Sequence, residues 1–386
     1  MVTDSRMEVP LVDLKAAFEP IRDEVLREFA SILDRMQLLL GPNAEAFERE
    51  FTEYCGARHG VAVSNGTDAL YAALVACGVG PGDEVIAPSH TFFATIEAIV
   101  HTGATPVLVD VEPDTLTMDP AEARGAVTDA TRAIVPVHLY GHPVDMDPIL
   151  ELARERDLRV IEDAAQAHGA VYKGRRCGSL GDAASFSFYF TKNLGAVGEA
   201  GFVTANDPAI AEKVRLLRHH GHTSKFEHAL FGHNLRMDEL QAAFLRIRLR
   251  DLDRALDRRR TNASLYTELF SGSAVATLRS RPETTPVHHL YPIRVADRDG
   301  LIAYLSDWGI GTGIHYPVPT HRQPALENQP HRCHSMAVTD IAAGEIVSIP
   351  MYPELSEDQI RYVAKRVLEF AHGGRGASSA PNDLTA

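Results

Sequence analysis

Short apolar runs alternate with longer amphipathic segments between about residues 60 and 205. The runs are continuous rather than alternating, and they lie at 60–63, 84–88, 105–110, 132–137 and 158–162. A helical spacing of apolar residues separates the first two runs. Continuous apolar strands are typical of sheets buried on both faces, and strand–helix alternation favours parallel pairing. The pattern therefore predicts an α/β fold, in which a mostly parallel sheet is sandwiched by helices.

Helical patterns flank this region. Apolar residues recur at three- and four-residue steps over about 13–40, where Gly41-Pro42 is expected to end the helix. Further amphipathic or strand-like segments are expected at 207–221, 237–270, 287–295 and 297–308. Ser356 and Gln359 have the spacing of a capping box before a closing helix that reaches His372.

These patterns predict two domains. Residues 1–255 form a large domain that includes the N-terminal helical segment, and residues 256–372 form a smaller α+β domain. Residues 373–386 are rich in Gly, Ser and Ala, which is the composition of a disordered tail.

Composition narrows the function classes. The 386 residues carry a formal charge of −14, which argues against binding to nucleic acid. No apolar stretch approaches the roughly 20 residues of a membrane span, so no membrane association is expected. The four cysteines form no C-x-x-C pair and the N-terminus lacks a signal pattern, so a cytoplasmic protein is predicted. The 18 histidines show no convincing ligand spacing, and no metal site is expected.

A candidate phosphate site lies at the start of the helix predicted after residue 66. Gly66 and Thr67 follow the first apolar strand and open this helix. The free amides and the dipole of a helix N-terminus favour an anion, and glycine permits close approach. Taken alone, this turn is explained better by a simple helix cap. Ser187, on a later strand, is a candidate second hydroxyl for the same phosphate.

A carboxylate and a lysine follow downstream. Asp163 ends the apolar strand at 158–162, at the edge where ligands bind in open α/β sheets. Lys192 lies between apolar residues, where a partly desolvated amine reacts as a neutral nucleophile. Each residue alone also fits a structural role, as a capping aspartate or a snorkelling lysine. Together with the phosphate loop, they are the parts that hold pyridoxal phosphate (PLP): the lysine bonds the cofactor and the carboxylate pairs with its ring nitrogen.

Other residues extend this site. Gln166, in the turn after Asp163, is a candidate partner for the ring hydroxyl, whereas His168 is either packed or supporting. Phe92 follows the strand at 84–88 and is a candidate for stacking on the cofactor ring, with a core position as the alternative.

Five motifs carry a resemblance to the DegT/StrS-type sugar aminotransferases, which have the aspartate-aminotransferase fold (fold type I). They are Ser64-Asn65-Gly66-Thr67-Asp68-Ala69-Leu70, Pro88-Ser89-His90-Thr91-Phe92-Phe93-Ala94-Thr95, Glu162-Asp163-Ala164-Ala165-Gln166-Ala167-His168-Gly169, Ser185-Phe186-Ser187-Phe188-Tyr189-Phe190-Thr191-Lys192-Asn193 and the segment 232–243. The resemblance runs from about residue 9 to about 370. It implies PLP-dependent transfer of an amino group, usually from glutamate, to a keto group of a nucleotide-linked sugar.

The resemblance also implies roles for single residues. Lys192 is similar to the cofactor-bonding lysine, and Asn234 to a phosphate contact that comes from a neighbouring subunit, which implies a homodimer with shared active sites. Tyr316 resembles a residue of the substrate loop. Ala200 departs from the family, which often has glycine there.

The sequence leaves the substrate and one rival function open. A dTDP-linked 3- or 4-keto-6-deoxysugar is predicted, with a cyclitol ketone or a non-catalytic PLP-binding regulator as alternatives. A metal enzyme and a nicotinamide dehydrogenase are disfavoured. The glycines at 78–82 lie between a helix and a strand, the reverse of the order in a dinucleotide-binding fingerprint.

Overall fold

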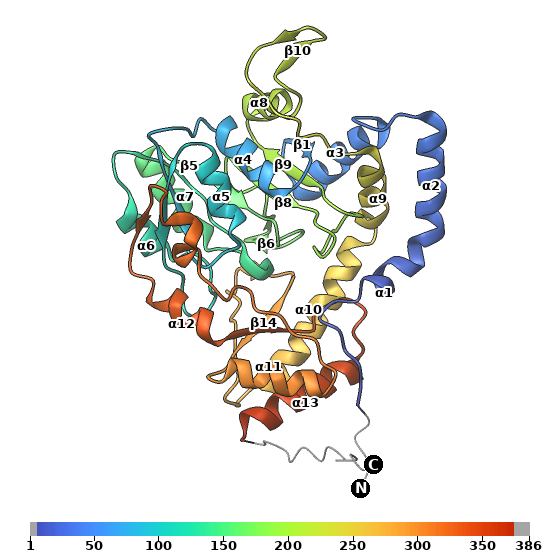
Figure 1. Ribbon diagram of the computed structural model, residues 1–386, viewed down its shortest axis with the longest axis vertical. Coiled ribbons are helices and arrows are strands. Elements are labelled where there is room, and N and C mark those ends of the chain that lie inside the picture. Colours follow the sequence, from blue (N-terminus) through green and yellow to red (C-terminus); the bar gives the residue numbers. More distant parts are fainter. Residues whose placement is uncertain (1–5, 374–386) are drawn as a thin grey trace, which may run out of the picture.

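The computed structural model describes residues 6–373. Its main sheet has eight strands in the order β1-β9-β8-β5-β4-β2-β3-β15 (Figure 1). Only β9 runs antiparallel to its neighbours, whereas the other pairs are parallel. The predicted mostly parallel α/β sheet is confirmed. The strands are β1 (His59–Val63), β2 (Glu84–Pro88), β3 (Thr105–Val109), β4 (Thr131–Ile134), β5 (Arg159–Asp163), β8 (Ala183–Ser187), β9 (Gly201–Ala205) and β15 (Arg332–Cys333).

Helices cover both faces of this sheet because its strands bury side chains on both. In β1, Val61 and Val63 join one apolar core, with helices α4, α5 and α8, whereas Ala62 joins the opposite core, with α3, α7 and α9. The helices of this part are α1 (Leu14–Phe18), α2 (Arg22–Arg35), α3 (Pro42–Cys55), α4 (Gly66–Ala76), α5 (Ala94–His101), α6 (Pro120–Ala126), α7 (Met146–Arg156), α8 (Pro208–Arg218) and α9 (Glu239–Leu249). Short 3-10 turns lie at η1 (Glu19–Ile21) and η2 (Leu139–Gly141).

A second core lies at the other end of the molecule, below the main sheet in Figure 1. It is built on a three-stranded antiparallel sheet in the order β12-β14-β16. Val9, from the N-terminal segment, packs into this core, and β15 returns to the main sheet. The division of the chain near residue 255 stays a prediction. The elements are α10 (Leu252–Phe270), β12 (Ala276–Thr277), β14 (Tyr291–Arg294), α11 (Arg298–Asp307), η3 (Thr320–Arg322), η4 (Pro324–Leu326), α12 (Ala337–Glu345), β16 (Ile346–Ile349) and α13 (Glu357–Ala371).

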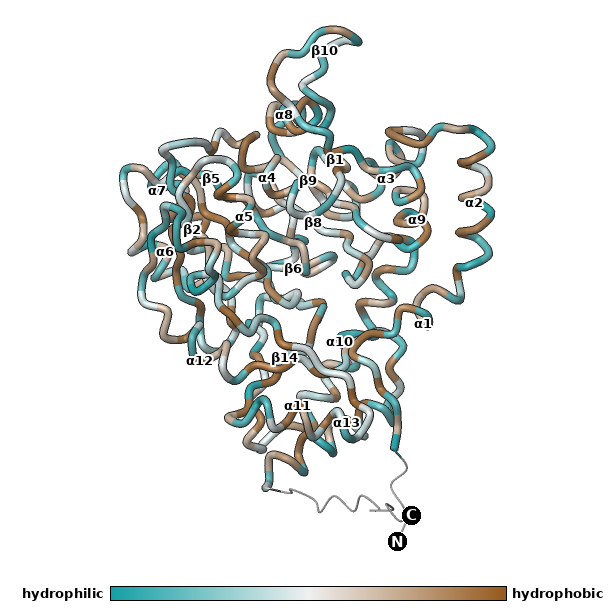
Figure 2. Tube along the Cα trace, viewed as in Figure 1, coloured by the Kyte–Doolittle hydropathy of each residue, from teal (hydrophilic) through white to brown (hydrophobic). Residues whose placement is uncertain are grey.

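Two small sheets complete the fold. One has the order β13-β6-β7, and the other is the hairpin β10-β11, which projects from the body of the molecule (Figure 1). Their strands are β6 (Val171–Tyr172), β7 (Arg175–Arg176), β10 (His222–Ser224), β11 (Glu227–His228) and β13 (Thr284–Thr285). Helix α2 lies at the edge of the molecule (Figure 1). Hydrophobic and hydrophilic residues alternate along its length (Figure 2).

Several predicted boundaries were wrong. The helix expected over 13–40 is α1, η1 and α2, and it ends where Met36 takes a left-handed conformation (φ 52°), not at Gly41-Pro42. The segment 237–270 is interrupted at Arg250 and Asp251, which separate α9 from α10. The strands expected at 132–137 and 287–295 shrink to β4 and β14.

Other predictions can be compared directly. The capping box is confirmed, because Ser356 and Gln359 each accept from the other's backbone N–H. The predicted tail lies outside the described residues, apart from Gly373. Between residues 6 and 373, no helix is long and apolar enough to cross a membrane.

Candidate active site

The sheet brings the predicted phosphate loop against Ser187. β8 ends at Ser187, and α4 begins at Gly66 directly after β1. A Cβ on residue 66 would lie only 2.5 Å from the Cβ of Ser187, so this close approach requires glycine. The two predicted phosphate contacts are therefore neighbours in space.

The cap of α4 leaves its first amides available. Asn65 is the N-cap: its Oδ1 accepts the N–H of Asp68 at 2.9 Å and its Nδ2 donates to Asp68 Oδ2 at 2.7 Å. Ser64 also donates to that carboxylate. The amides of Gly66 and Thr67 lie in the first turn, where a helix has no internal acceptor for them. These N–H groups form a cradle suited to a phosphate.

Asp163 is a buried carboxylate at the end of β5. Thr95 Oγ1 donates to its Oδ2 at 2.8 Å, and the backbone N–H of Ala165 donates to its Oδ1 at 3.2 Å. Burial raises the pKa of Asp163, while these donors and the Lys192 charge oppose that rise. A carboxylate held in this way is oriented to receive a protonated ring nitrogen.

Lys192 lies in the loop between β8 and β9. Phe188 anchors the loop: its N–H donates to Ala200 O at 2.7 Å and its carbonyl accepts from Ala196 N at 2.8 Å. Desolvation lowers the pKa of Lys192 to about 8, and the charges of Asp163 and Glu199 oppose the shift. A substantial fraction of the amine is thus neutral near physiological pH, as a nucleophilic lysine requires.

The Ala200 departure fits this backbone. Ala200 is fully buried and has no left-handed conformation. Its neighbour Gly201 is the position that cannot carry a Cβ, because a Cβ there would collide with the backbone carbonyl of Asn65. The extra methyl group of Ala200 is therefore accommodated.

Gln166, Tyr316 and Phe92 form one wall of the site. The Oε1 of Gln166 accepts the N–H of Tyr140 at 2.6 Å, and its Nε2 donates to the hydroxyl of Tyr316 at 3.1 Å. The rings of Phe92 and Tyr316 are 5.5 Å apart, and Phe92 is 56% exposed. Phe92 is thus a free aromatic face rather than a core residue, whereas the side-chain amide of Gln166 is already engaged by protein groups.

The structure does not bring Asn234 together with these residues. Its side chain is exposed, in the segment between the β10–β11 hairpin and α9. No hydrogen bond joins its side chain to the other site residues in the described chain. His168 is buried among Phe51, Phe186 and Phe188, and burial lowers its pKa to about 3, so it packs as a neutral ring.

Several residues of the site escaped the sequence reasoning. Thr95 lies in one of the five motifs, but the motif predicts no role for it, and no motif predicts a role for Tyr140. The hydroxyl of Tyr140 lies 2.7 Å from His90 Nε2 and donates to the carbonyl of His315. His289 Nδ1 lies 3.4 Å from Asn193 Oδ1, beside Lys192. Such contacts join distant segments, and no local motif signals them.

One buried cluster has ligand-type atoms within 4.8 Å of one another: His138, Glu162 and Cys177. Glu162 accepts backbone N–H groups from Gly178, Leu180 and Gly181 at 2.8–2.9 Å and lies 3.0 Å from His138 Nε2. The other His138 nitrogen accepts the N–H of Val144. Because the polar atoms of His138 and Glu162 are already hydrogen-bonded within the protein, we interpret the cluster as structural. It fixes the loop after β7.

The residues present fit PLP. The Gly66–Ser187 cradle, whose space a Cβ would fill, matches a phosphate; Asp163 matches a ring nitrogen; and the neutral fraction of Lys192 matches a covalent bond to an aldehyde. The exposed face of Phe92 suits a flat ring.

Known proteins resemble this chain over most of its length. Residues 19–368 match the model of the DegT/DnrJ/EryC1/StrS aminotransferase family. A dTDP-3-amino-3,4,6-trideoxy-alpha-D-glucose transaminase of Streptomyces venezuelae is 46% identical, over 94% of this chain and 96% of that protein. A pleiotropic regulatory protein of Geobacillus stearothermophilus is 43% identical, over 94% and 99%. The crystal structure of S. venezuelae DesV in complex with a ketimine intermediate, 46% identical, superimposes with a TM-score of 0.92 and covers 94% of this chain and 98% of that chain.

The sequence resemblance is thereby confirmed over nearly the whole chain, together with the fold and the cofactor that it implied. The chain belongs to the DegT/DnrJ/EryC1/StrS aminotransferase family and is a PLP-dependent aminotransferase.

Proposed function

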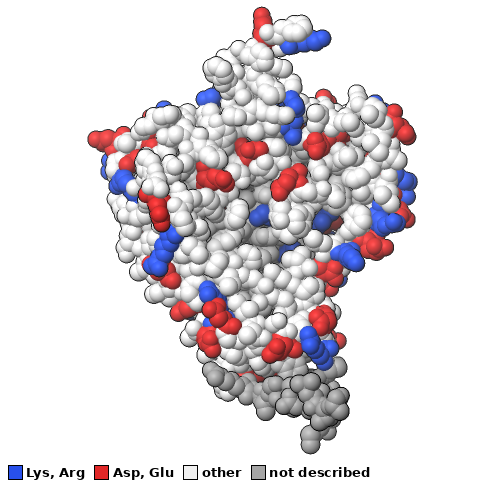
Figure 3. Space-filling view, viewed as in Figure 1, with Lys and Arg blue, Asp and Glu red and all other residues white. Residues whose placement is uncertain are grey.

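We propose that this enzyme transfers an amino group from L-glutamate to a 3- or 4-keto-6-deoxysugar linked to dTDP. The observation that carries the proposal is the pairing of a lysine whose pKa is lowered to about 8 with the buried carboxylate of Asp163. The S. venezuelae relative, named for a dTDP-aminosugar, supports the substrate class. Basic side chains show in a hollow between the upper and lower parts of the molecule (Figure 3), which suits an anionic diphosphate.

The chain's own residues divide the work. Bound PLP supplies an electron sink for negative charge at the donor's α-carbon. Lys192 Nζ holds the cofactor at rest and, once released, accepts and returns the proton of that carbon. Asp163, oriented by Thr95, keeps a proton on the ring nitrogen. Gly66, Thr67 and Ser187 bind the phosphate, Phe92 covers the ring, and Gln166 positions Tyr316 toward the sugar.

The active enzyme is proposed to be a homodimer with shared sites. Two exposed aromatic residues, Phe226 and Phe231, lie in and next to the projecting β10–β11 hairpin, close in sequence to Asn234. Leu26 and Leu33 of helix α2, and Met36 directly after it, are also exposed. Contiguous patches of exposed apolar side chains mark protein interfaces, and we propose that these residues contribute to such a patch. A second copy of the chain that covers them would bring Asn234 to the phosphate cradle of its partner.

Complementation tests the shared site. Lys192→Ala and Asn234→Ala are each expected to be inactive or strongly impaired as homodimers. Mixed under conditions of subunit exchange, they form heterodimers in which one site is intact, and activity returns. Absence of recovery, with heterodimers shown by native mass spectrometry, would contradict the shared site.

The substrate is tested on the enzyme in its pyridoxamine phosphate form. Each dTDP keto-sugar, and a cyclitol ketone as the alternative, is added while the cofactor absorbance is followed. Return of the PLP spectrum with the 3-keto or the 4-keto sugar identifies the position of amination. Return only with the cyclitol would replace the proposed substrate. Failure to convert PLP with any amino donor would favour the regulator alternative.

A cytoplasmic location is also part of the proposal. The four cysteines are free thiols, three of them buried, which suits a reducing compartment.

A further inference from the structure

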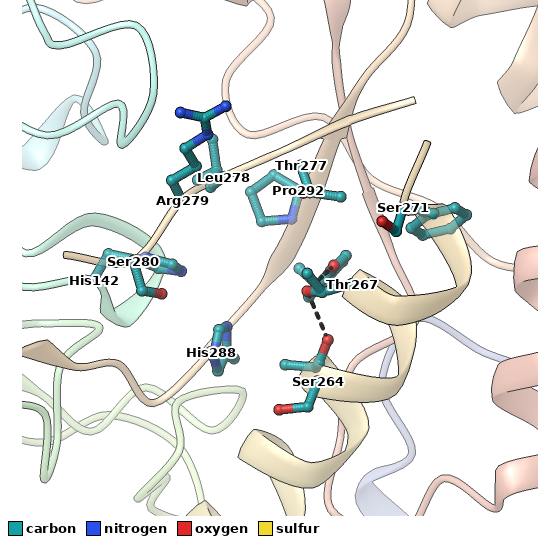
Figure 4. Close-up of a pocket in the computed structure, with 13 residues that line it drawn as sticks. His142, Ser264, Thr267, Ser271, Thr277, Leu278, Arg279, Ser280, His288 and Pro292 are labelled. Atoms are coloured by element: carbon teal, nitrogen blue, oxygen red, sulfur yellow. Dashed lines mark hydrogen bonds between the residues drawn. The ribbon is translucent and has the colours of Figure 1, made fainter. Parts of the chain in front are cut away.

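A pocket of about 610 Å³ lies between α10, the β12 region, the start of β14 and His142. Figure 4 shows its labelled side chains around an open centre. This volume is in the range of small-molecule sites, about 300–1,000 Å³. None of the proposed catalytic or cofactor-binding residues lines it, so it is separate from the Lys192 site.

Two neutral histidines form one side of the pocket. His142 is only 4% exposed, and its ring packs edge-to-face on that of His288 at 5.1 Å. Burial lowers the pKa of His142 to about 4 and that of His288 well below its ordinary value. Neither ring hydrogen-bonds to another side chain or to the backbone within residues 6–373. Both residues line the pocket, and ring nitrogens without a protein partner are free to donate to or accept from a ligand there.

The rest of the lining is hydroxylated and almost uncharged. Its hydroxyl groups come from Ser264, Thr267, Ser271, Thr277, Ser280 and Tyr291. Arg279 is the one charged residue of the lining; its side chain is 78% exposed, pairs with Asp114 at 3.4 Å and is turned away from His288 in Figure 4. Neutral imidazoles and hydroxyls both donate and accept, as sugar hydroxyls do.

The lining also has apolar surface, from Phe270, Leu278 and Pro292. The C–H face of a sugar ring needs such a surface, whereas a compact anion does not. The pocket also faces the C-terminal end of α10, where the helix dipole disfavours an anion.

The pocket lies behind two loops of the active site. Tyr140, two residues before His142, donates its N–H to Gln166, and His289, beside His288, faces Asn193. A ligand there therefore contacts the outer side of the loops that hold the site, not the cofactor itself.

We propose that this pocket is a second binding site, for a neutral carbohydrate of one or two rings. Its hydroxyls pair with His142, His288 and the serines and threonines of α10 and β12, and a ring face packs on the apolar lining.

Saturation-transfer NMR on the PLP-loaded enzyme tests this site, with methyl α-D-glucopyranoside and maltose as probes. His142→Phe keeps the ring contact with His288 and removes both nitrogens. Ser264→Leu fills the exposed mouth of the pocket at a helical position. Ser306→Leu, at an exposed helical position of α11, is the matched control.

The wild type and Ser306→Leu should show saturable binding of at least one probe. Ser264→Leu should abolish it, and His142→Phe should weaken it by about tenfold, as expected for lost neutral hydrogen bonds. Tyr316→Phe should leave it unchanged, which distinguishes the pocket from the proposed sugar site. Absence of saturable binding by the wild type overturns the proposal, as does binding that both pocket variants retain. If the wild type binds inorganic phosphate but neither sugar, and His142→Phe weakens that binding, the pocket takes an anion. The proposal of a neutral carbohydrate ligand would then be overturned.

Discussion

Thr95 Oγ1 donates a 2.8 Å hydrogen bond to Oδ2 of Asp163, linking the first turns of α5 to the end of β5. Thr91 Oγ1 lies 2.9 Å behind Thr95 and orients its hydroxyl. Both threonines are buried, so the bond is shielded from water. It lowers the pKa of Asp163 against the opposing effect of burial. Thr95 is thus a positioning residue for the carboxylate that faces the cofactor nitrogen.

Thr95→Val should weaken catalysis without preventing folding. Without the hydroxyl, the pKa of Asp163 rises further, so the carboxylate is less often charged when it meets the ring nitrogen. A hydrogen bond to a charged group contributes about 1.5–3 kcal/mol, so kcat should fall by roughly tenfold or more. Stopped-flow measurement of the half-reaction with glutamate checks this.

Thr102→Val is the control for that change. Thr102 is also a buried threonine at the end of α5, and its hydroxyl donates to Ile99 O at 2.7 Å. It has no contact with Asp163. If both variants lose activity equally, the effect is general destabilisation of α5 and the role of Thr95 is contradicted.

The site residues differ in whether a short sequence motif marks them. Gly66, Asp163 and Lys192 lie at or after the ends of strands in short motifs, and the parallel sheet brings strand ends to one edge, so the sequence was enough to group them. Thr95 and Tyr140 act through contacts with Asp163 and Gln166, 68 and 26 residues away in the chain. These contacts depend on how α5 and η2 pack. The helix end at Met36 was not predicted, because nothing in the sequence marks a methionine in the left-handed conformation. Gly41-Pro42 has the residue types of a helix end and therefore misled the prediction.

Gly66→Ala should lose cofactor affinity. The added Cβ would lie 2.5 Å from the Cβ of Ser187, and either α4 or β8 must move. That movement misplaces the amides of Gly66 and Thr67 for the phosphate. The dissociation constant for PLP, titrated by fluorescence, should rise by at least about tenfold.

Gly125→Ala is the matched glycine control. It lies within α6, and a Cβ there meets no atom within 4 Å. Alanine in a helix is favoured over glycine by about 0.5–1 kcal/mol, so this variant should be slightly more stable and bind PLP normally. Equal PLP affinity in Gly66→Ala and Gly125→Ala would contradict the assignment of Gly66 to the phosphate site.

Tyr316→Phe should affect the sugar half-reaction more than the glutamate half-reaction. The change removes the hydroxyl that accepts from Gln166 Nε2 at 3.1 Å and leaves that amide without its partner. The loss is about 1 kcal/mol, seen as a higher KM for the keto-sugar. Tyr304→Phe removes a comparable hydroxyl, bonded to Glu369 at 3.1 Å in the small core, and should leave both half-reactions unchanged. If Tyr316→Phe slows the glutamate half-reaction more than the sugar half-reaction, the proposed contact of Tyr316 with the sugar is contradicted.

Lys192 should make the cofactor-free protein less stable below its own pKa. The folded pKa is about 8 against an ordinary 10.5, so between these values the unfolded chain binds a proton that the folded chain does not. Stability then rises with pH across this window. Below about pH 8 the folded protein bears the full cost of a desolvated charge, and above 10.5 neither state is charged.

Lys192→Met removes that cost and should abolish covalent PLP binding and turnover. The apo variant is therefore expected to have a higher urea midpoint than apo wild type below pH 8, with the difference shrinking as pH rises toward 10.5. Lys15→Met, at an exposed position of α1, should show no such pH-dependent difference. A Lys192→Met advantage that is constant with pH would mean that packing, not charge, sets it. The amine that makes the cofactor bond would then not be the desolvated group described here.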